Sequence, residues 1–217
     1  MFYKEVKISF TSKIDYSFAI KITFDDFKSA SKSCCGGNPT SKQYNSFEAA
    51  ESVGNIGTKL EMAMFVAQVL HESACLKSKV EYKCKKNEKL CAHYEHKHGF
   101  PGKIYYGRGY IQLTHSENYK KASTALFGDN RLLRKPEQVA NNEEIAWKTA
   151  FWYWKVRVHK LKGVQSGNFG SSTRGINGGE CTKTKLHHRA KRRFTCFKKV
   201  LKALRMNDKA IEKGCYN

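Results

Sequence analysis

Eight cysteines constrain the fold of this 217-residue chain more than any other feature of its sequence. Cys34, Cys35, Cys84 and Cys91 lie in polar stretches rich in Gly or Lys, where a reduced thiol would have no packing role. We therefore interpret the cysteines as disulfide-bonded and predict an oxidising compartment, with the protein secreted or extracellular. The alternative is a zinc site, because His93 follows Cys91, but zinc ligands usually recur at spacings of about two to four residues, unlike Cys84 and Cys91. We expect no metal and no cofactor.

The net charge is +21, from 40 Lys and Arg residues against 19 Asp and Glu residues. This charge indicates either electrostatic contact with an anionic surface or a solvated surface without a particular partner, and composition leaves both open. No run of about 18 apolar residues exists, so we expect no transmembrane segment. The chain also shows no signal peptide at Met1, because residues 1–10 lack an unbroken apolar stretch. The missing signal disagrees with the compartment that the cysteines indicate, and our prediction follows the cysteines.

Most of the apolar periodicity in the chain is helical. The clearest helix spans residues 59–72, where Thr58 and Glu61 fit a capping box and apolar residues follow at helical spacing. Further helices are predicted over 47–53, from the Thr114 and Glu117 capping box towards 127, after the N-cap Asn142, and over 186–204. Loops are predicted over 32–46, 77–103 and 163–179. Alternating apolar residues over 6–10 and 18–24 predict a small β-hairpin, so the predicted fold is mainly α with a hairpin at the N-terminus.

Glu72 is the first candidate catalytic residue. On a helical wheel at about 100° per residue it lies at the border of the apolar stripe, so burial should raise its pKa and suit a general acid. The alternative is an exposed glutamate at a helix end. His71 points away from the stripe, and we interpret it as a structural hydrogen-bonding group. The zinc motif HExxH is excluded, because its second histidine would be Cys75.

A glycosidase needs a second carboxylate, and the candidates downstream are Glu81, Glu88 and Glu95. In a continuous helix Glu81 would lie about 180° round the axis and about 13.5 Å along it from Glu72, so the chain must leave the helix after Glu72. A turn over residues 73–79 could then bring the two carboxyl groups to the separation of about 6.5–9.5 Å that an inverting mechanism requires.

Four segments of the chain resemble glycoside hydrolase family 19, the plant-type chitinases, and in particular its short-loop members. The segments are FVAQVLHES (65–73), YYGRGYIQLTHSENY (105–119), WKTAFWYW (147–154) and INGGEC (176–181), and they occur in the family's order. The resemblance implies a mainly helical, two-lobed, lysozyme-like fold with a substrate cleft between the lobes. It implies one catalytic domain over 24–217 and leaves residues 1–23 as an N-terminal extension that the resemblance does not cover.

The resemblance also implies an endochitinase that hydrolyses β-1,4 bonds between N-acetylglucosamine units with inversion. Glu72 then matches the general acid, Glu81 the general base that activates water, and Thr114 the residue that orients this water. The remaining implied contacts, with substrate, are Gln112, Asn118, Asn177 and Arg193, with Arg192 as the alternative to Arg193. Of Tyr105 and Tyr106 we expect one in the core and one stacked on a sugar, and we assign the sugar contact to Tyr106.

Several of these residues have a second interpretation. Thr114 could equally be only a helix N-cap. Trp147 and Trp154 are expected in the core, and the glycines of GRG (107–109) are expected to bring the backbone close to the sugar. Tyr110 stands where the family commonly has Pro, and SE (116–117) replaces an Asn-Tyr pair, so the affinity of individual subsites should differ from that of other members.

The resemblance suggests disulfides between Cys181 and Cys215 and between Cys84 and Cys91. Cys75 would bind Cys34 or Cys35, and Cys196 the remaining one. We expect a monomer that binds chitin or chito-oligosaccharides and no nucleic acid. The alternatives are a peptidoglycan muramidase, a non-catalytic carbohydrate-binding protein, and a nucleic-acid binder that uses the basic segment 189–205 and would show steep salt dependence.

Overall fold

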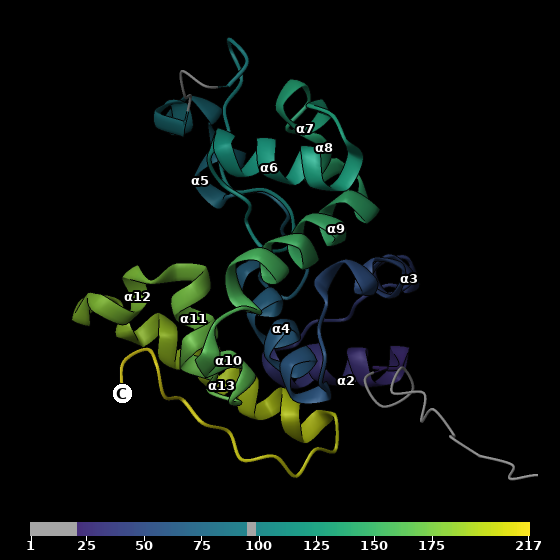
Figure 1. Ribbon diagram of the computed structural model, residues 1–217, viewed down its shortest axis with the longest axis vertical. Coiled ribbons are helices and arrows are strands. Elements are labelled where there is room, and N and C mark those ends of the chain that lie inside the picture. The colour runs from purple at the N-terminus through teal and green to yellow at the C-terminus, as the bar shows by residue number, and fades with distance from the viewer. Residues whose placement is uncertain (1–20, 95–98) are drawn as a thin grey trace, which may run out of the picture.

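The computed structural model describes residues 21–94 and 99–217, and within these ranges the protein is mainly helical, as predicted (Figure 1). Most of the predicted hairpin and nearly all of the N-terminal extension lie outside the described residues, and where the predicted second strand is described, Phe24 begins α2 instead. Extended pairing in the described part is limited to isolated bridges, such as that between Val80 and Arg108. The α-helices are α2 (Phe24–Cys35), α3 (Ser41–Ala50), α4 (Lys59–Glu72), α5 (Tyr82–Lys86), α6 (Ser116–Phe127), α7 (Arg131–Arg134), α8 (Gln138–Asn141), α9 (Glu143–Tyr153), α10 (Lys162–Gln165), α11 (Phe169–Asn177), α12 (Gly179–Thr182) and α13 (His187–Ala203). Shorter turns of other helix types are η1 (Glu51–Gly54), η2 (Glu88–Tyr94), the π-helical η3 (Trp154–Val158) and η4 (Thr184–Leu186).

The helices form two lobes. Figure 1 shows α5 to α8 gathered in one lobe, α2 to α4 and α10 to α13 in the other, and α9 running between them. In the larger lobe α13 packs against α2 and α4, and α9 packs against α3. Aromatic side chains of α4 and α9 interdigitate in the core, where the rings of Phe65 and Phe151 stack with their centroids 4.2 Å apart. The two-lobed, lysozyme-like architecture that the resemblance implied is therefore present.

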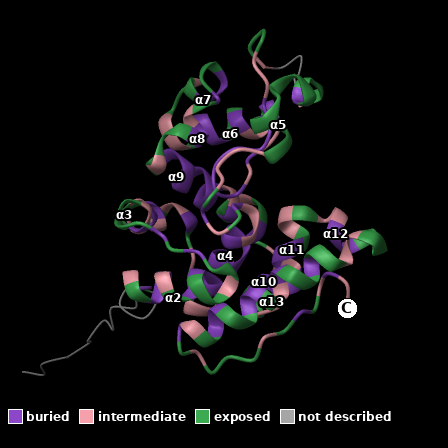
Figure 2. Ribbon diagram, turned by 180° about the vertical axis from the view of Figure 1, so that it is seen from behind, coloured by how far each residue is buried: buried purple, intermediate pink, exposed green. Residues whose placement is uncertain are grey.

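Helix α4 lies at the centre of the larger lobe and has the bounds that its sequence predicts. The Thr58 hydroxyl accepts the backbone N–H of Glu61 at 3.1 Å and so caps the helix. The predicted apolar stripe is wrong in one respect, because every residue from Glu61 to Leu70 is buried (Figure 2). A helix buried on all sides is held by its neighbours over its whole length, and this fixes the position of Glu72 at its end.

Two predicted loops are shorter than expected. The helix α2 continues to Cys35, where Gly36 ends it with a φ of 70°, and Thr40 with Gln43 forms a capping box that begins α3. The segment 163–179 contains α10 and α11, although its composition predicts a loop. Tertiary packing explains this difference, because a Cβ at Gly170 of α11 would lie 1.7 Å from the carbonyl oxygen of Glu212 in the C-terminal segment.

Of the two predicted N-caps downstream, one is confirmed and one is wrong. Asn142 accepts the backbone N–H of Ile145 at 3.0 Å and caps α9. Thr114 does not cap α6, which begins at Ser116 after His115, a residue with a φ of 73°. The intervening turn directs the Thr114 hydroxyl to the carbonyl of Gln112, 2.8 Å away, so it is not spent on the helix.

Four disulfides join the eight cysteines, and they agree with the pairs that the resemblance suggested. Cys181 is bound to Cys215 and Cys84 to Cys91, while Cys75 binds Cys35 and Cys196 binds Cys34. Two of them tie the end of α2 to α13 and to the turn that follows α4. Among the residues that the structure describes, no helix has the length and apolar character needed to span a bilayer.

Candidate active site

A hollow of about 490 Å³ lies between the two lobes, and we call it the cleft. It contains five of the residues that the sequence proposed for the site, from four separate segments of the chain. These are Glu72 at the end of α4, Gln112 and Thr114 in the loop before α6, Asn118 in α6 and Asn177 at the end of α11. The remaining lining residues are Tyr94, Ile111, His115, Tyr153, Arg157 and Ile176. Glu81, Tyr106 and Arg193 do not line it.

Glu72 is anchored from below by Arg193. The Nη2 atom of Arg193 lies 2.5 Å from Oε1 of Glu72, and the guanidinium is 1% exposed. Glu180 binds the same guanidinium in bidentate fashion, with Nε to Oε2 at 2.7 Å and Nη2 to Oε1 at 2.9 Å. Burial alone would lower the pKa of Arg193, but Glu72 and Glu180 outweigh burial and raise this pKa above its ordinary value. Arg193 is therefore a permanent cation beneath the carboxylate.

The network around Arg193 extends along α4 and into α11. Its Nη1 atom donates to Oε1 of Gln68 at 3.0 Å, and the Gln68 amide donates to the hydroxyls of Ser172 and Thr173 in α11. Every member of this group is hydrogen-bonded, and all but Glu72, which borders the cleft, are buried, which is the condition under which a buried polar network fixes geometry.

The predicted sugar contact by Arg193 needs correction. The side chain is buried and already bound by Glu72, Glu180 and Gln68, so it can act on a substrate only through Glu72. Arg192, the alternative, is exposed and lines a separate hollow on the other side of α13. Sequence could not distinguish these positions, because neighbouring residues of a helix point about 100° apart.

Glu81 adjoins the cleft through its neighbours. It precedes α5, and its Oε1 accepts the hydroxyl of Tyr94, a cleft residue, at 3.5 Å. Its Oε2 accepts the backbone N–H of Gly107 at 3.3 Å. A Cβ on Gly107 would lie 3.4 Å from Oγ1 of Thr114, so Glu81 and Thr114 approach the same glycine. The chain leaves the helical conformation after Glu72, as the two-carboxylate hypothesis required.

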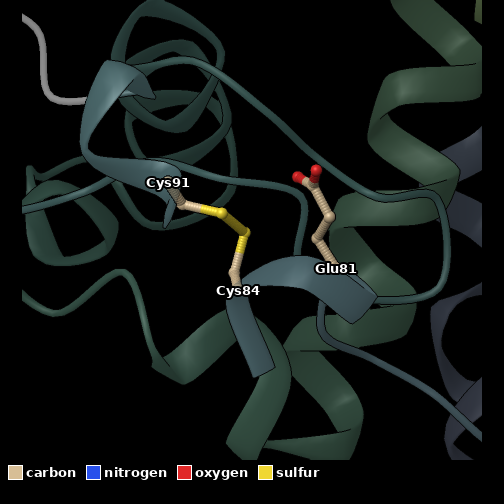
Figure 3. A group of neighbouring side chains, drawn as sticks. All are labelled: Glu81, Cys84 and Cys91. Carbon is tan, nitrogen blue, oxygen red and sulfur yellow. A yellow bond between two sulfur atoms is a disulfide. The ribbon is translucent and has the colours of Figure 1, made fainter. Parts of the chain in front are cut away.

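The carboxylate of Glu81 also lies near the disulfide of Cys84 and Cys91 (Figure 3). One carboxylate oxygen and the two sulfur atoms lie within 4.8 Å of one another. Both sulfurs are consumed in the disulfide, so neither can form the thiolate that binds zinc. The disulfide instead holds η2 against α5, and with it Tyr94 against Glu81.

The loop before α6 presents its polar side chains through local hydrogen bonds. The Gln112 amide donates to the carbonyl of Gly109 at 3.0 Å, and the Asn118 amide donates to the carbonyl of Thr114 at 2.8 Å. Gly107 allows this packing, because a Cβ there would lie 2.9 Å from Oε1 of Gln112. The glycines of the GRG segment thus permit close contacts within the protein, and their approach to the sugar stays a prediction.

Neither tyrosine of the pair 105–106 forms an open platform. Tyr105 is fully buried, as expected for one of the two. Tyr106 is 9% exposed, and the guanidinium of Arg108 lies 3.5 Å from its ring centroid. A covered face cannot stack on a pyranose, so the expected sugar contact by Tyr106 finds no support. Tyr110 is also buried and packs on Trp147, so its departure from the family pattern alters the core beside the cleft.

Four polar residues of the cleft were missed from the sequence: Tyr94, His115, Tyr153 and Arg157. Tyr153 and Arg157 are four residues apart on a continuous helical segment, a spacing that puts them on one face, but nothing in the sequence indicated which face meets the cleft. Burial raises the pKa of Tyr153, and burial together with Glu81 raises the pKa of Tyr94, so both hydroxyls are neutral donors at physiological pH.

His71 does not belong to the cleft. It lines the hollow beside α13 that also contains Arg192. Burial, followed by the charges of Arg193, Arg192 and Arg189, lowers the pKa of His71 to about 3. The imidazole is therefore neutral at pH 7 and takes no part in proton transfer at Glu72.

Comparison with known proteins agrees with this arrangement. The family model described as chitinase class I matches residues 24–166. Endochitinase EP3 of Arabidopsis thaliana is 36% identical over 181 residues, covering 73% of this chain and 59% of the relative. Chitinase 4 of Oryza sativa subsp. japonica is 32% identical over 181 residues, covering 73% of this chain and 56% of the relative. The chain thus spans less than two thirds of the length of these relatives.

Solved structures show the same fold. Chitinase C from Streptomyces griseus superposes with a TM-score of 0.68 at 26% identity, covering 85% of this chain and 79% of the other. The class IV chitinase of family GH19 from Zea mays gives a TM-score of 0.67 at 26% identity, covering 87% and 94%. On the match to the family model over most of its length, the chain belongs to the class I chitinase family, glycoside hydrolase family 19.

Proposed function

We propose that the protein is an endo-acting chitinase that hydrolyses β-1,4 bonds between N-acetylglucosamine units with inversion at the anomeric carbon. Family membership and the cleft between the lobes support the proposal, since the cleft volume falls in the range of about 300–1,000 Å³ usual for ligand sites. The observation that carries it is the position of Glu72 at the cleft surface. The buried guanidinium of Arg193 holds the Glu72 carboxylate from beneath and is itself bound by a second carboxylate, that of Glu180.

Glu72 is the general acid in this proposal. It protonates the glycosidic oxygen as the bond to the anomeric carbon breaks, and the leaving sugar departs with a new hydroxyl group. The acid must exist both with and without its proton during turnover. Glu180 serves this requirement, because it neutralises Arg193 in either state of Glu72.

Glu81 is the general base. It removes a proton from a water molecule that attacks the anomeric carbon from the face opposite the leaving group, so a β bond gives an α product. Thr114 orients this water, for its hydroxyl donates to Gln112 and retains lone pairs that can accept a hydrogen bond. Tyr94 and the N–H of Gly107 hold the Glu81 carboxylate through one oxygen each.

The remaining polar groups bind the sugar chain. Gln112, Asn118 and Asn177 are assigned to contacts with sugar hydroxyl and acetamido groups, since amide side chains both donate and accept. Arg193 is a positioning residue that acts through Glu72. We place the protein outside the cytosol, in an extracellular or vacuolar compartment, because four disulfides persist in an oxidising environment. We also propose that it acts as a monomer.

The test follows hydrolysis of an N-acetylglucosamine hexamer by NMR and identifies the anomer of the first products. We expect early α-anomer from the wild-type protein, and at least about a thousandfold lower turnover from Glu72→Gln. Glu137→Gln is the matched control, because Glu137 is exposed and lies in the other lobe, outside the cleft.

Four outcomes would overturn the proposal. Early β-anomer would reject inversion, and an active Glu72→Gln variant would reject the acid. If the hexamer stays intact while peptidoglycan is cleaved in a parallel sample, the protein is a muramidase, and if neither is cleaved it is a carbohydrate-binding protein with a hydrolase fold.

A further inference from the structure

A second hollow, of about 590 Å³, lies along α13 and is lined by Arg192 and not by Arg193. We call it the basic groove. One wall is a stripe of α13, and the other is formed by the end of α4, the turn after it and the end of α2. Two disulfides line it: that of Cys34 and Cys196 joins the two walls, and that of Cys35 and Cys75 lies within the second wall. Its lining residues are Cys34, Cys35, Leu70, His71, Ala74, Cys75, His188, Lys191, Arg192, Thr195, Cys196 and Lys199.

The charges in the basic groove have one sign. Lys191, Arg192 and Lys199 follow His188 at helical spacing along α13, and all four residues are exposed. Among the described residues no Asp or Glu lines the groove, and α13 contains none. Within residues 21–94 and 99–217, no carboxylate forms an ion pair with Lys191, Arg192 or Lys199. The charge of the groove is therefore uncompensated within this part of the chain.

His71 lines the groove beside this charge. After burial, the charges of Arg193, Arg192 and Arg189 in α13 lower the pKa of His71 to about 3, and of these three arginines Arg192 lines the groove. An uncompensated cluster of cations around a concave surface concentrates anions, because the low-dielectric walls focus the field.

We propose that the basic groove binds an acidic polysaccharide, at a site separate from the catalytic cleft. The stripe from His188 to Lys199 is about 16 Å long at 1.5 Å per residue, so it spans several sugar units of an extended chain. A neutral chitin chain would gain nothing from these charges. The site therefore adds to the proposed function a second ligand class, whose sulfate or carboxylate groups would pair with Lys191, Arg192 and Lys199.

A glycan fits the groove better than a nucleic acid does. Proteins that hold single strands present aromatic rings on which bases stack, and no Phe, Tyr or Trp of the described chain lines the groove. Its apolar surface comes instead from Leu70, Ala74 and the disulfides. The disulfides also indicate an oxidising compartment, where acidic glycans are available to the protein.

The test measures binding of a heparin-derived decasaccharide by isothermal titration calorimetry over a range of NaCl concentrations. The variant Arg192→Gln with Lys199→Gln removes two groove charges. The matched control Arg134→Gln with Lys135→Gln removes the same two residue types from the exposed end of α7, in the other lobe (Figure 1). Circular dichroism and the melting temperature establish that both variants fold.

We expect the groove variant to bind at least about tenfold more weakly at 0.15 M salt, and the control variant to bind within about twofold of wild type. The slope of log K against log salt should fall in magnitude by about two for the groove variant, one for each lost contact. The NMR signals of His71 should shift on addition of the decasaccharide to the wild-type protein.

Equal losses in both variants would overturn the proposal, because they would trace binding to net charge alone. Unchanged His71 signals with bound decasaccharide would place the ligand elsewhere and overturn it as well. A single-stranded DNA decamer that binds more tightly than the decasaccharide, with the same dependence on Arg192 and Lys199, would make the groove a nucleic-acid site. None of these measurements requires hydrolysis, so they are independent of the proposed catalytic function.

Discussion

Replacing Glu180 with Gln should destabilise the protein by about 3–5 kcal/mol, the usual cost of removing one partner from a buried ion pair. The contacts of Glu180 explain why this loss of stability is large for a single substitution. Glu180 is 2% exposed and meets two nitrogens of Arg193 at 2.7 and 2.9 Å, and it also accepts the Asn177 amide at 3.1 Å. A Gln side chain retains one acceptor but turns an N–H group towards a guanidinium that only donates. Arg193 would keep Glu72 as its sole carboxylate among the described residues.

The assay is urea denaturation at pH 7 with the disulfides intact, followed by circular dichroism. The loss should appear as a lower midpoint with an unchanged slope, and in a thermal scan as a melting temperature about 6–20 °C lower. Glu137→Gln removes the same charge from an exposed position and should change the free energy of unfolding by less than about 0.5 kcal/mol. Turnover of the hexamer should also fall, because Arg193 would then oppose the protonated form of Glu72.

The reasoning is refuted if Glu180→Gln costs less than about 1 kcal/mol while the midpoint of the control is unchanged. Such a result would mean that water or a shifted side chain compensates Arg193, and that Glu180 is not needed to hold the guanidinium beneath Glu72.

Three further predictions test other parts of the structure. Because His71 has a pKa of about 3 when folded and near 6.5 when unfolded, the unfolded state binds the proton first, so stability is lost as the pH falls from about 6.5 towards 3, by up to about 1.4 kcal/mol per pH unit. The variant His71→Gln should lose this part of the pH dependence in urea denaturation, and an unchanged profile would contradict the assignment. The double variant Cys84→Ser with Cys91→Ser removes one short crosslink and should lower the free energy of unfolding by about 2–3 kcal/mol. Turnover should fall as well, since the crosslink holds η2 against α5. Unchanged kinetics would mean that the disulfide does not help to position Glu81. Trp154→Phe deletes the indole N–H that Glu61 accepts at 2.8 Å in the core and should cost about 1–3 kcal/mol in the same denaturation assay; a neutral effect would mean that His159, whose Nδ1 lies 2.8 Å from the same oxygen, satisfies Glu61 without the indole.

The sequence predicted well where local chemistry decides the structure. Residues 59–72 combine a capping threonine with helical apolar spacing, and both signals agree with the burial of α4, so its bounds followed directly. The N-cap at Asn142 was predicted correctly for the same reason. Thr114 failed because its capping signal depends on the backbone of His115, whose positive φ directs the hydroxyl elsewhere, and no local rule predicts such a turn.

Segments whose structure depends on distant contacts were less predictable. Glycine and serine in residues 163–179 favour a loop by propensity, but α11 is stabilised by packing on the C-terminal segment and by the hydrogen bonds of Gln68 to Ser172 and Thr173. The residues of the cleft also divide into those that the sequence predicts and those that depend on distant contacts. Motif residues such as Gln112 and Asn177 were identified by resemblance, whereas His115 and Arg157 enter the cleft through tertiary geometry that carries no sequence signal.

Helices α4 and α13 explain how the larger lobe can contribute to two proposed sites, a cleft for a neutral polymer and a groove for an acidic one. His71 and Glu72 are adjacent in α4, as are Arg192 and Arg193 in α13, and the first of each pair lines the basic groove while the second lies at or beneath the cleft. The carboxylates of Glu72 and Glu180 compensate the charge of Arg193, so the buried network adds little positive potential to the cleft. The rate at which a neutral polymer is hydrolysed should therefore vary little with salt. Arg192 has no such partner among the described residues, so binding in the groove should weaken steeply as salt rises. Both quantities can be measured on one protein sample over the same salt range. A constant hydrolysis rate together with a falling affinity for the decasaccharide would show that the two sites are separate. A parallel decline of both would place the two ligands in one electrostatic field and contradict the separation.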